Sequence, residues 1–178
     1  MRPALCAGLS FMDAARSESL GLGDLVTWMR GHLVEPGLMP MPGSVHEPGV
    51  GAVPISEAPN HAWATSHEQR AARIVATARV RVAVMLGGLV ARPLDDRFLA
   101  AAIFAGRVTR MNTEDGRAWL PSPKEGDRLS DIVLACFAAD ALDHRDEYDD
   151  RLSVCEVCGR IGFARDTVLR TRCAQHES

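Results

Sequence analysis

The chain has 178 residues, which is enough for one domain with a hydrophobic core or for such a domain with a small appendage. Hydrophobic residues make up 47% of it and charged residues 24%, and the formal net charge of −3 gives no overall sign of a nucleic-acid partner. The longest weakly charged apolar stretch, residues 82–91, is far shorter than the roughly 20 residues that cross a bilayer, so we expect a cytoplasmic protein without a membrane partner.

The first sixty residues divide into two predicted segments. Residues 1–34 could contain a short amphipathic helix between Phe11 and Leu33, although three glycines weaken that pattern. Residues 35–60 hold six prolines and four glycines with scarcely any hydrophobic periodicity. Such a composition is typical of a linker or of an arm lying on the surface, and we place a boundary near Asn60.

Residues 61–150 are predicted to form a helical core domain. A helix is expected from Ser66, which could cap it, and one stripe of apolar residues at helical spacing supports this interpretation. Residues 79–84 also alternate as a strand would, and Gly87 and Gly88 could kink or end the helix. The predicted stripe consists of Ala71, Ile74, Val75, Ala78, Val82, Met85, Leu86 and Leu89.

The rest of this domain is predicted to contain two helices and a hairpin. Pro93 followed by two acids indicates a second helix start, residues 107–121 read as a β-hairpin, and Ser130 caps a third helix with Cys136 in the core. The expected fold is therefore mainly α (α+β): a small helical domain with one hairpin near 107–121, followed by a treble-clef or ribbon-like zinc finger over residues 151–178.

The finger is predicted from four residues in two pairs, Cys155 with Cys158 and Cys173 with His176, in the pattern C-x2-C-x14-C-x2-H. A two-residue gap lets both side chains of a pair turn toward one point, and two such pairs suit the tetrahedral coordination of zinc. Gly159 directly after the first pair suits a turn that requires a positive φ. We therefore expect one structural Zn²⁺ bound by these four residues.

Three other interpretations of these residues remain open. Cys155 and Cys158 could form a redox dithiol, although the strand–helix context of such motifs is missing. A catalytic zinc would need an open fourth position, and His144 could replace His176 as a ligand. The structural interpretation is favoured because residues 152–178 contain few large apolar side chains, so bound metal would have to supply the missing stabilisation.

The stretch "CEVCG" (residues 155–159), followed by "IGFAR" (residues 161–165), resembles the zinc finger of the DksA/TraR family. The resemblance covers about residues 155–178, and His176 stands where that family commonly has a cysteine. It implies a C-terminal finger in which Cys155, Cys158 and Cys173 are ligands. It also implies action in the secondary channel of RNA polymerase.

The sequence favours a non-enzymatic zinc protein that binds another protein as a regulator or adaptor. No nucleophile, acid–base pair or phosphate-binding loop is recognisable, and "HRD" (residues 144–146) lacks the asparagine that a kinase catalytic loop requires. Nucleic acid is the less favoured partner, because acidic residues 140–150 adjoin the finger. A structural subunit of a larger assembly is the third alternative.

Overall fold

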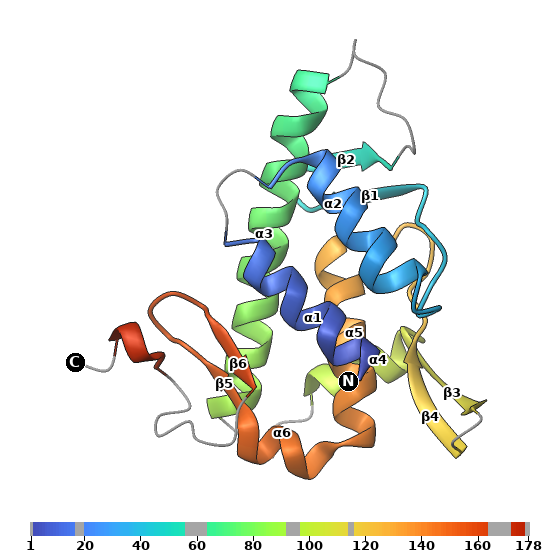
Figure 1. Ribbon diagram of the computed structural model, residues 1–178, viewed down its shortest axis with the longest axis vertical. Coiled ribbons are helices and arrows are strands. Elements are labelled where there is room, and N and C mark those ends of the chain that lie inside the picture. Colours follow the sequence, from blue (N-terminus) through green and yellow to red (C-terminus); the bar gives the residue numbers. More distant parts are fainter. Residues whose placement is uncertain are drawn as a thin grey trace.

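The computed structural model describes residues 2–16, 20–55, 64–91, 97–113, 116–163 and 172–176 (Figure 1). Six α-helices and three two-stranded antiparallel hairpins lie within these ranges, which confirms a mainly α fold with some β. The helices are α1 (Pro3–Ala14), α2 (Leu22–Met29), which continues into a π-helical turn (Arg30–Val34), α3 (Ala64–Ala91), α4 (Arg97–Phe104), α5 (Leu129–Asp143) and α6 (Arg145–Arg151). The strands are β1 (Ser44–Glu47), β2 (Gly51–Pro54), β3 (Val108–Thr113), β4 (Gly116–Pro121), β5 (Leu152–Val154) and β6 (Ile161–Phe163), and a 3₁₀ turn (Ala174–His176) follows.

Helix α5 is the centre of the hydrophobic core. It packs against α1, α3, α4 and β4, and Figure 1 shows it running behind α1 with α3 alongside. Its sequence is apolar almost all round, as expected for an interior helix, and Phe137 and Cys136 are fully buried. Burial raises the pKa of the Cys136 thiol to about 12, and its predicted place in the core is confirmed. A Cβ at Gly8 would lie 2.6 Å from the Phe137 ring, so this glycine lets α1 approach α5.

Helix α3 differs in detail from its prediction. It begins at Ala64 rather than at Ser66, and it continues through Gly87 and Gly88, so the strand alternative is wrong. The predicted stripe is buried apart from Met85, which is 41% exposed. The other side of the helix carries Val84, which is 68% exposed. An apolar outer face therefore remains uncovered over the second half of α3.

The predicted linker contains an ordered hairpin, which corrects the expectation of an irregular segment over residues 44–54. Val45 pairs with Val53, and both side chains are fully buried against the core. The Val50 N–H donates to the Glu47 carbonyl at 3.1 Å across a Pro–Gly turn in which Gly49 has a φ of 80°. Those are features of a type II turn, a signal that the count of prolines and glycines concealed. Asn60 lies outside the described residues, and the division into domains stays a prediction.

Glu47 joins this hairpin to two helices. It is 1% exposed, and its Oε1 accepts a 2.7 Å hydrogen bond from the backbone N–H of Ser130 at the start of α5. Its Oε2 lies 3.5 Å from the Arg81 Nε on α3. A carboxylate at a helix N-terminus satisfies a donor that has no partner within the helix, so Glu47 stabilises the arrangement of β1, α3 and α5.

The remaining elements match their predictions in part. The hairpin near 107–121 is confirmed, with Val108 opposite Pro121 and Thr113 opposite Gly116. The predicted helix start at residues 93–96 lies outside the described residues, and α4 is described from Arg97. The N-terminal segment contains two helices rather than one short one, and the rings of Phe11 and Trp28 pack at 5.0 Å between their centroids.

Candidate metal centre

The first ligand pair lies in the loop that joins β5 to β6. The hairpin register aligns Val154 with Ile161, so Cys155 leaves the end of one strand and Arg160 leads into the other. The Cys155 N–H donates to the Arg160 carbonyl, and the Gly159 N–H donates to the Cys155 carbonyl, both at 2.8 Å. Gly159 has a φ of 66°, which a residue with a side chain rarely adopts. We call residues 155–159 the knuckle.

The second pair reaches the same point from the 3₁₀ turn. The His176 N–H donates to the Cys173 carbonyl at 2.7 Å, and this turn directs both side chains toward the knuckle. His176 Nδ1 lies 3.2 Å from the Cys173 sulfur and 3.4 Å from the Cys155 sulfur. The sulfurs of Cys158 and Cys173 lie 3.8 Å apart. One ligand atom from each of the four residues falls within 4.8 Å of all the others.

These spacings fit a tetrahedral metal site. With zinc–sulfur bonds near 2.3 Å and zinc–nitrogen bonds near 2.0 Å, tetrahedral ligands stand about 3.8 Å apart for two sulfurs and about 3.5 Å apart for a sulfur and a nitrogen. The measured separations of 3.8, 3.4 and 3.2 Å lie close to these values. The four residues predicted from the sequence therefore form a cluster that could hold one metal ion.

Backbone groups favour the thiolate form of one ligand. Burial alone would raise the pKa of Cys155, but hydrogen bonds from the backbone N–H groups of Cys158, Cys173 and Val157 lower it to about 6. Burial raises the pKa of Cys158, and the neighbouring thiols of Cys155 and Cys173 raise it further because they disfavour a second negative charge. A second thiolate beside that of Cys155 is therefore disfavoured when no cation is bound.

The hairpin that carries the knuckle is packed onto the helical core. Leu152 is fully buried, and the Phe163 ring lies 5.0 Å from the ring of Tyr148 in an edge-on contact. The Arg2 guanidinium lies 5.1 Å from the Phe163 ring centre and 3.2 Å from Asp140 on α5. Burial raises the pKa of Asp140, and the charge of Arg2 opposes that rise. The finger is thus attached through β5 and β6 by apolar contacts and by the cation–π contact of Arg2 with Phe163.

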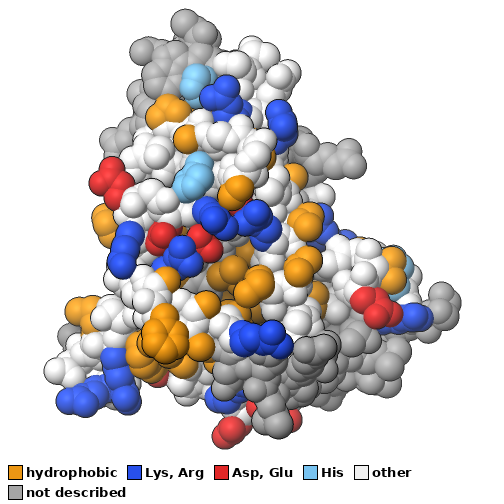
Figure 2. Space-filling view, turned by 180° about the vertical axis from the view of Figure 1, so that it is seen from behind, with side chains coloured by type: hydrophobic (Ala, Val, Ile, Leu, Met, Phe, Trp, Pro, Cys, Tyr) orange, Lys and Arg blue, Asp and Glu red, His pale blue; other side chains and the backbone are white. Residues whose placement is uncertain are grey.

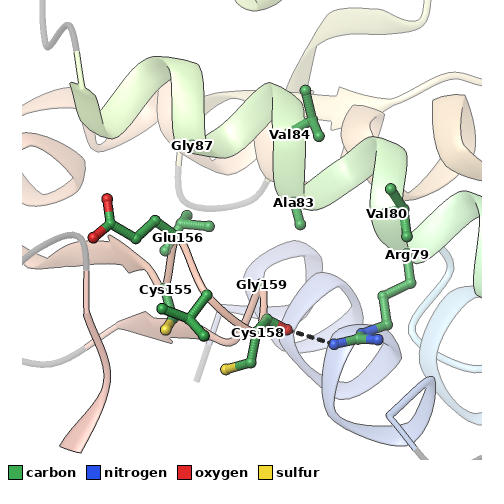
Figure 3. Close-up of a pocket in the computed structure, with 11 residues that line it drawn as sticks. Arg79, Val80, Ala83, Val84, Gly87, Cys155, Glu156, Cys158 and Gly159 are labelled. Carbon is green, nitrogen blue, oxygen red and sulfur yellow. Dashed lines mark hydrogen bonds between the residues drawn. The ribbon is translucent and has the colours of Figure 1, made fainter. Parts of the chain in front are cut away.

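The knuckle itself rests on α3 (Figure 3). Arg79 donates from Nη2 to the Cys158 carbonyl at 2.7 Å, and Figure 3 shows its side chain extending from the helix toward the knuckle. A Cβ at Gly159 would lie 3.2 Å from the Ala83 Cβ, so the glycine serves both the turn and this close approach. Sequence reasoning missed these supports, because nothing local links Arg79 to a turn 79 residues later.

The alternative ligand His144 lies elsewhere. It follows α5, and its Nδ1 lies 3.0 Å from the Asp140 carbonyl oxygen, so the structure does not bring it into the cluster. Among the residues that the structure describes, the four predicted ligands are the group of potential metal-binding side chains that comes together.

Comparisons with known proteins do not assign this chain to a family. No protein-family model, no curated protein and no solved structure matches it. The resemblance of the knuckle to the DksA/TraR finger therefore stays a prediction. No helix in the described ranges combines the length and the apolar character that crossing a bilayer requires.

Proposed function

We propose that this chain is a zinc-binding protein in which the metal is structural, and that it acts as a regulator or adaptor by contacting another protein. The observation that supports this proposal is the convergence of four ligand atoms within 4.8 Å. Three thiolates and one imidazole are a donor set that suits zinc, whereas calcium and magnesium prefer oxygen ligands.

The ligand count favours a structural over a catalytic metal. Cys155, Cys158, Cys173 and His176 would supply all four positions of a tetrahedron, and a catalytic zinc keeps one position for water or substrate. The location agrees with this role, because the metal would connect residues 172–176 to a hairpin that already packs on the core. Its contribution is then the ordering of the second ligand pair.

Charge pairing at the finger supports a protein partner rather than nucleic acid. Arg172 pairs with Glu156 at 2.9 Å, and Arg151 pairs with Glu147 at 3.0 Å, so these arginines are already matched by carboxylates. Nucleic-acid binding needs positive charge available to several phosphates. Val157, at the tip of the knuckle, is instead an aliphatic side chain that is 62% exposed. An apolar contact surface suits a protein.

Metal analysis of the purified chain tests the structural role. We expect one zinc per chain in the native protein and in Cys6→Ser, a control that changes a cysteine of α1 outside the cluster, and none in Cys158→Ser. Amide hydrogen exchange should show loss of protection in residues 172–176 on chelation, while α5 stays protected. Native protein without zinc, or chelation without any change in exchange, would contradict the proposal.

A second measurement tests the transcription-associated alternative suggested by the DksA/TraR resemblance. Filter binding of a labelled duplex at about 50 mM and about 200 mM salt should give weak retention at both concentrations. Tight binding that falls steeply with salt would favour a nucleic-acid partner. Specific capture by purified RNA polymerase would favour the family's activity. A stable complex of many copies in light scattering would favour the structural subunit.

A further inference from the structure

A groove of about 490 Å³ lies between α3 and the knuckle. One wall is the outer face of α3, and the opposite wall is the knuckle with the end of β5 (Figure 3). Ala83 and Gly87 lie one turn apart on α3, and their small size leaves the space open. We call this space the knuckle groove. Its apolar lining side chains are Val80, Ala83, Val84, Val154 and Val157.

The apolar lining is exposed to an unusual degree. Val80, Val84 and Val157 are 58%, 68% and 62% exposed, although many other valines of the chain are buried. Figure 2 shows hydrophobic side chains gathered in the middle of the rear face, with basic side chains around them. A group of aliphatic side chains that folding leaves in water is typical of a surface that another molecule covers.

A second hollow continues the knuckle groove along α3. It has a volume of about 320 Å³, it shares Val84 with the first, and Met85, Leu89 and Phe98 line it. The two hollows follow one helix face, so an elongated occupant such as a helical segment would fit them better than a compact small molecule.

Positive charge marks the amino-terminal end of the knuckle groove. Arg73 lies seven residues, or about two helical turns, before Val80, and so on the same side of α3. Arg79 lines the groove itself. Within the described ranges, no carboxylate lies within 4.0 Å of either guanidinium. Glu156 at the other end is paired with Arg172, so within the part of the chain that the structure describes Arg73 and Arg79 give the groove a positive end.

We propose that the knuckle groove binds an apolar segment of a partner protein that carries acidic side chains at one end. This inference rests on the proposed function and names the chemistry of its partner. Val80, Val84 and Val157 bury the apolar side chains of that segment, and Arg73 and Arg79 meet its carboxylates.

The metal centre should strengthen this binding. Cys155 and Cys158 belong to the wall that faces α3, and the same two residues contribute to the ligand cluster. Loss of the metal removes the link between that wall and Cys173 and His176, whereas the hairpin hydrogen bonds, the Arg79 bond and the contact at Ala83 stay in place. We therefore expect loss of the metal to weaken binding of the partner segment.

Fluorescence anisotropy with three labelled helical peptides tests the proposal on the full chain. The first carries leucines at positions i, i+3, i+4 and i+7 with glutamates toward one end, the second has lysines in place of the glutamates, and the third has serines in place of the leucines. We expect the acidic peptide to bind about tenfold more tightly than the other two, and a chelator to weaken its binding.

Variants locate the contact. Val84→Glu in one wall and Val157→Ser in the other should each weaken the acidic peptide about tenfold, and Arg73→Glu should weaken it about threefold. Met111→Glu is the matched control, because Met111 is 50% exposed on β3, outside the lining of the groove, and should leave binding unchanged. Val84 is exposed, so its substitution leaves the core intact, which thermal melting verifies.

The contrary outcomes are distinct. Absence of binding by every peptide, preference for the lysine peptide, or equal loss in Met111→Glu would overturn the proposal. A dimer in light scattering that Val84→Glu dissociates would identify a second copy of the chain as the occupant, which also overturns it. Zinc content measured in the same samples separates the two proposals: zinc-bound protein without peptide binding ends this one alone, whereas zinc-free native protein ends the proposed function.

Discussion

Helix α5 and the last described residues, 172–176, are held by different forces. Phe137 and Leu129 of α5 are fully buried, and helices pack around them on several sides. In residues 172–176, by contrast, Arg172 is exposed and Cys173 and His176 are half-buried. The contacts of this segment with the knuckle are the cluster of Cys173 and His176 and the ion pair of Arg172 with Glu156. The removal of apolar area from water stabilises the first region, and four converging ligand atoms define the second.

The hairpin of β5 and β6 lies between these extremes. Leu152 and Val154 are buried like core residues, yet the loop between the strands carries two of the four residues of the candidate metal cluster. A bound metal would therefore not replace a core for the whole finger, because the hairpin already shares the core of the helices. A destabilised helix and a missing metal should consequently have separable effects, and the following substitutions test that separation.

The largest effect is expected from Phe137→Ala. It removes a fully buried ring at the contact of α1 with α5, and such truncations cost about 3 to 5 kcal/mol. The melting temperature should fall by about 10 °C, while the zinc content of the folded protein at room temperature stays unchanged. Leu134→Ala on the same helix removes a partly buried side chain and serves as the milder control. An equal melting temperature for Phe137→Ala and the native protein would show that the core around α5 does not dominate the stability of the fold.

Glu47→Ala should have the next largest effect. It leaves the Ser130 N–H without its carboxylate partner and Arg81 without its ion pair, at a cost of about 2 kcal/mol in the free energy of unfolding. Chemical denaturation measures the change, and Glu35→Ala, an exposed carboxylate in the same part of the chain, should change it by less than about 0.5 kcal/mol. Similar values for the two variants would contradict the role of the hairpin as a link between α3 and α5.

Arg2 links α5 to the hairpin of β5 and β6, and the effect of Arg2→Ala on stability should depend on pH. The substitution removes the cation beside Asp140 and over Phe163, at a cost of about 1 to 2 kcal/mol at neutral pH. The pKa of Asp140 is raised in the folded protein and should rise further without Arg2. A raised carboxyl pKa contributes stability that is present below the unfolded-state pKa of Asp140 and is lost as pH rises through its folded-state pKa. The difference between variant and native protein should thus shrink as pH falls from about 7 toward about 4. A difference that stays constant, or that also appears for the exposed Arg30→Ala, would argue against this pairing.

Gly159→Ala should have the smallest effect on the helices and a clear one on the metal. An alanine there adopts a left-handed conformation at a cost of about 1 to 2 kcal/mol and approaches Ala83, so zinc affinity should fall about tenfold with little change in melting. Gly88→Ala is the opposite control, because Gly88 sits in a helix interior with open space around it and alanine should stabilise α3 by about 0.5 to 1 kcal/mol. Competition with a chromophoric chelator gives the affinities. Unchanged affinity in Gly159→Ala would mean that the knuckle can relax without loss of ligand geometry.

Local patterns explain which predictions succeeded. The ligand pairs are recognisable because each spans only four residues, so their spacing reports a turn without any knowledge of the fold. The hairpin near 107–121 and the inner stripe of α3 are confirmed for the same reason. The hairpin at 44–54 was missed because its prolines and glycines were counted as a composition, although Pro48 and Gly49 occupy the central positions of a turn.

The sequence by itself determined which four residues form the candidate metal cluster and which faces of the helices point inward, because both depend on spacings of a few residues along the chain. Only the tertiary structure decided that the knuckle rests on α3 and that a groove opens between them. That contact joins Arg79 to Cys158 and Ala83 to Gly159, positions far apart in the sequence whose approach depends on the packing of every element between them.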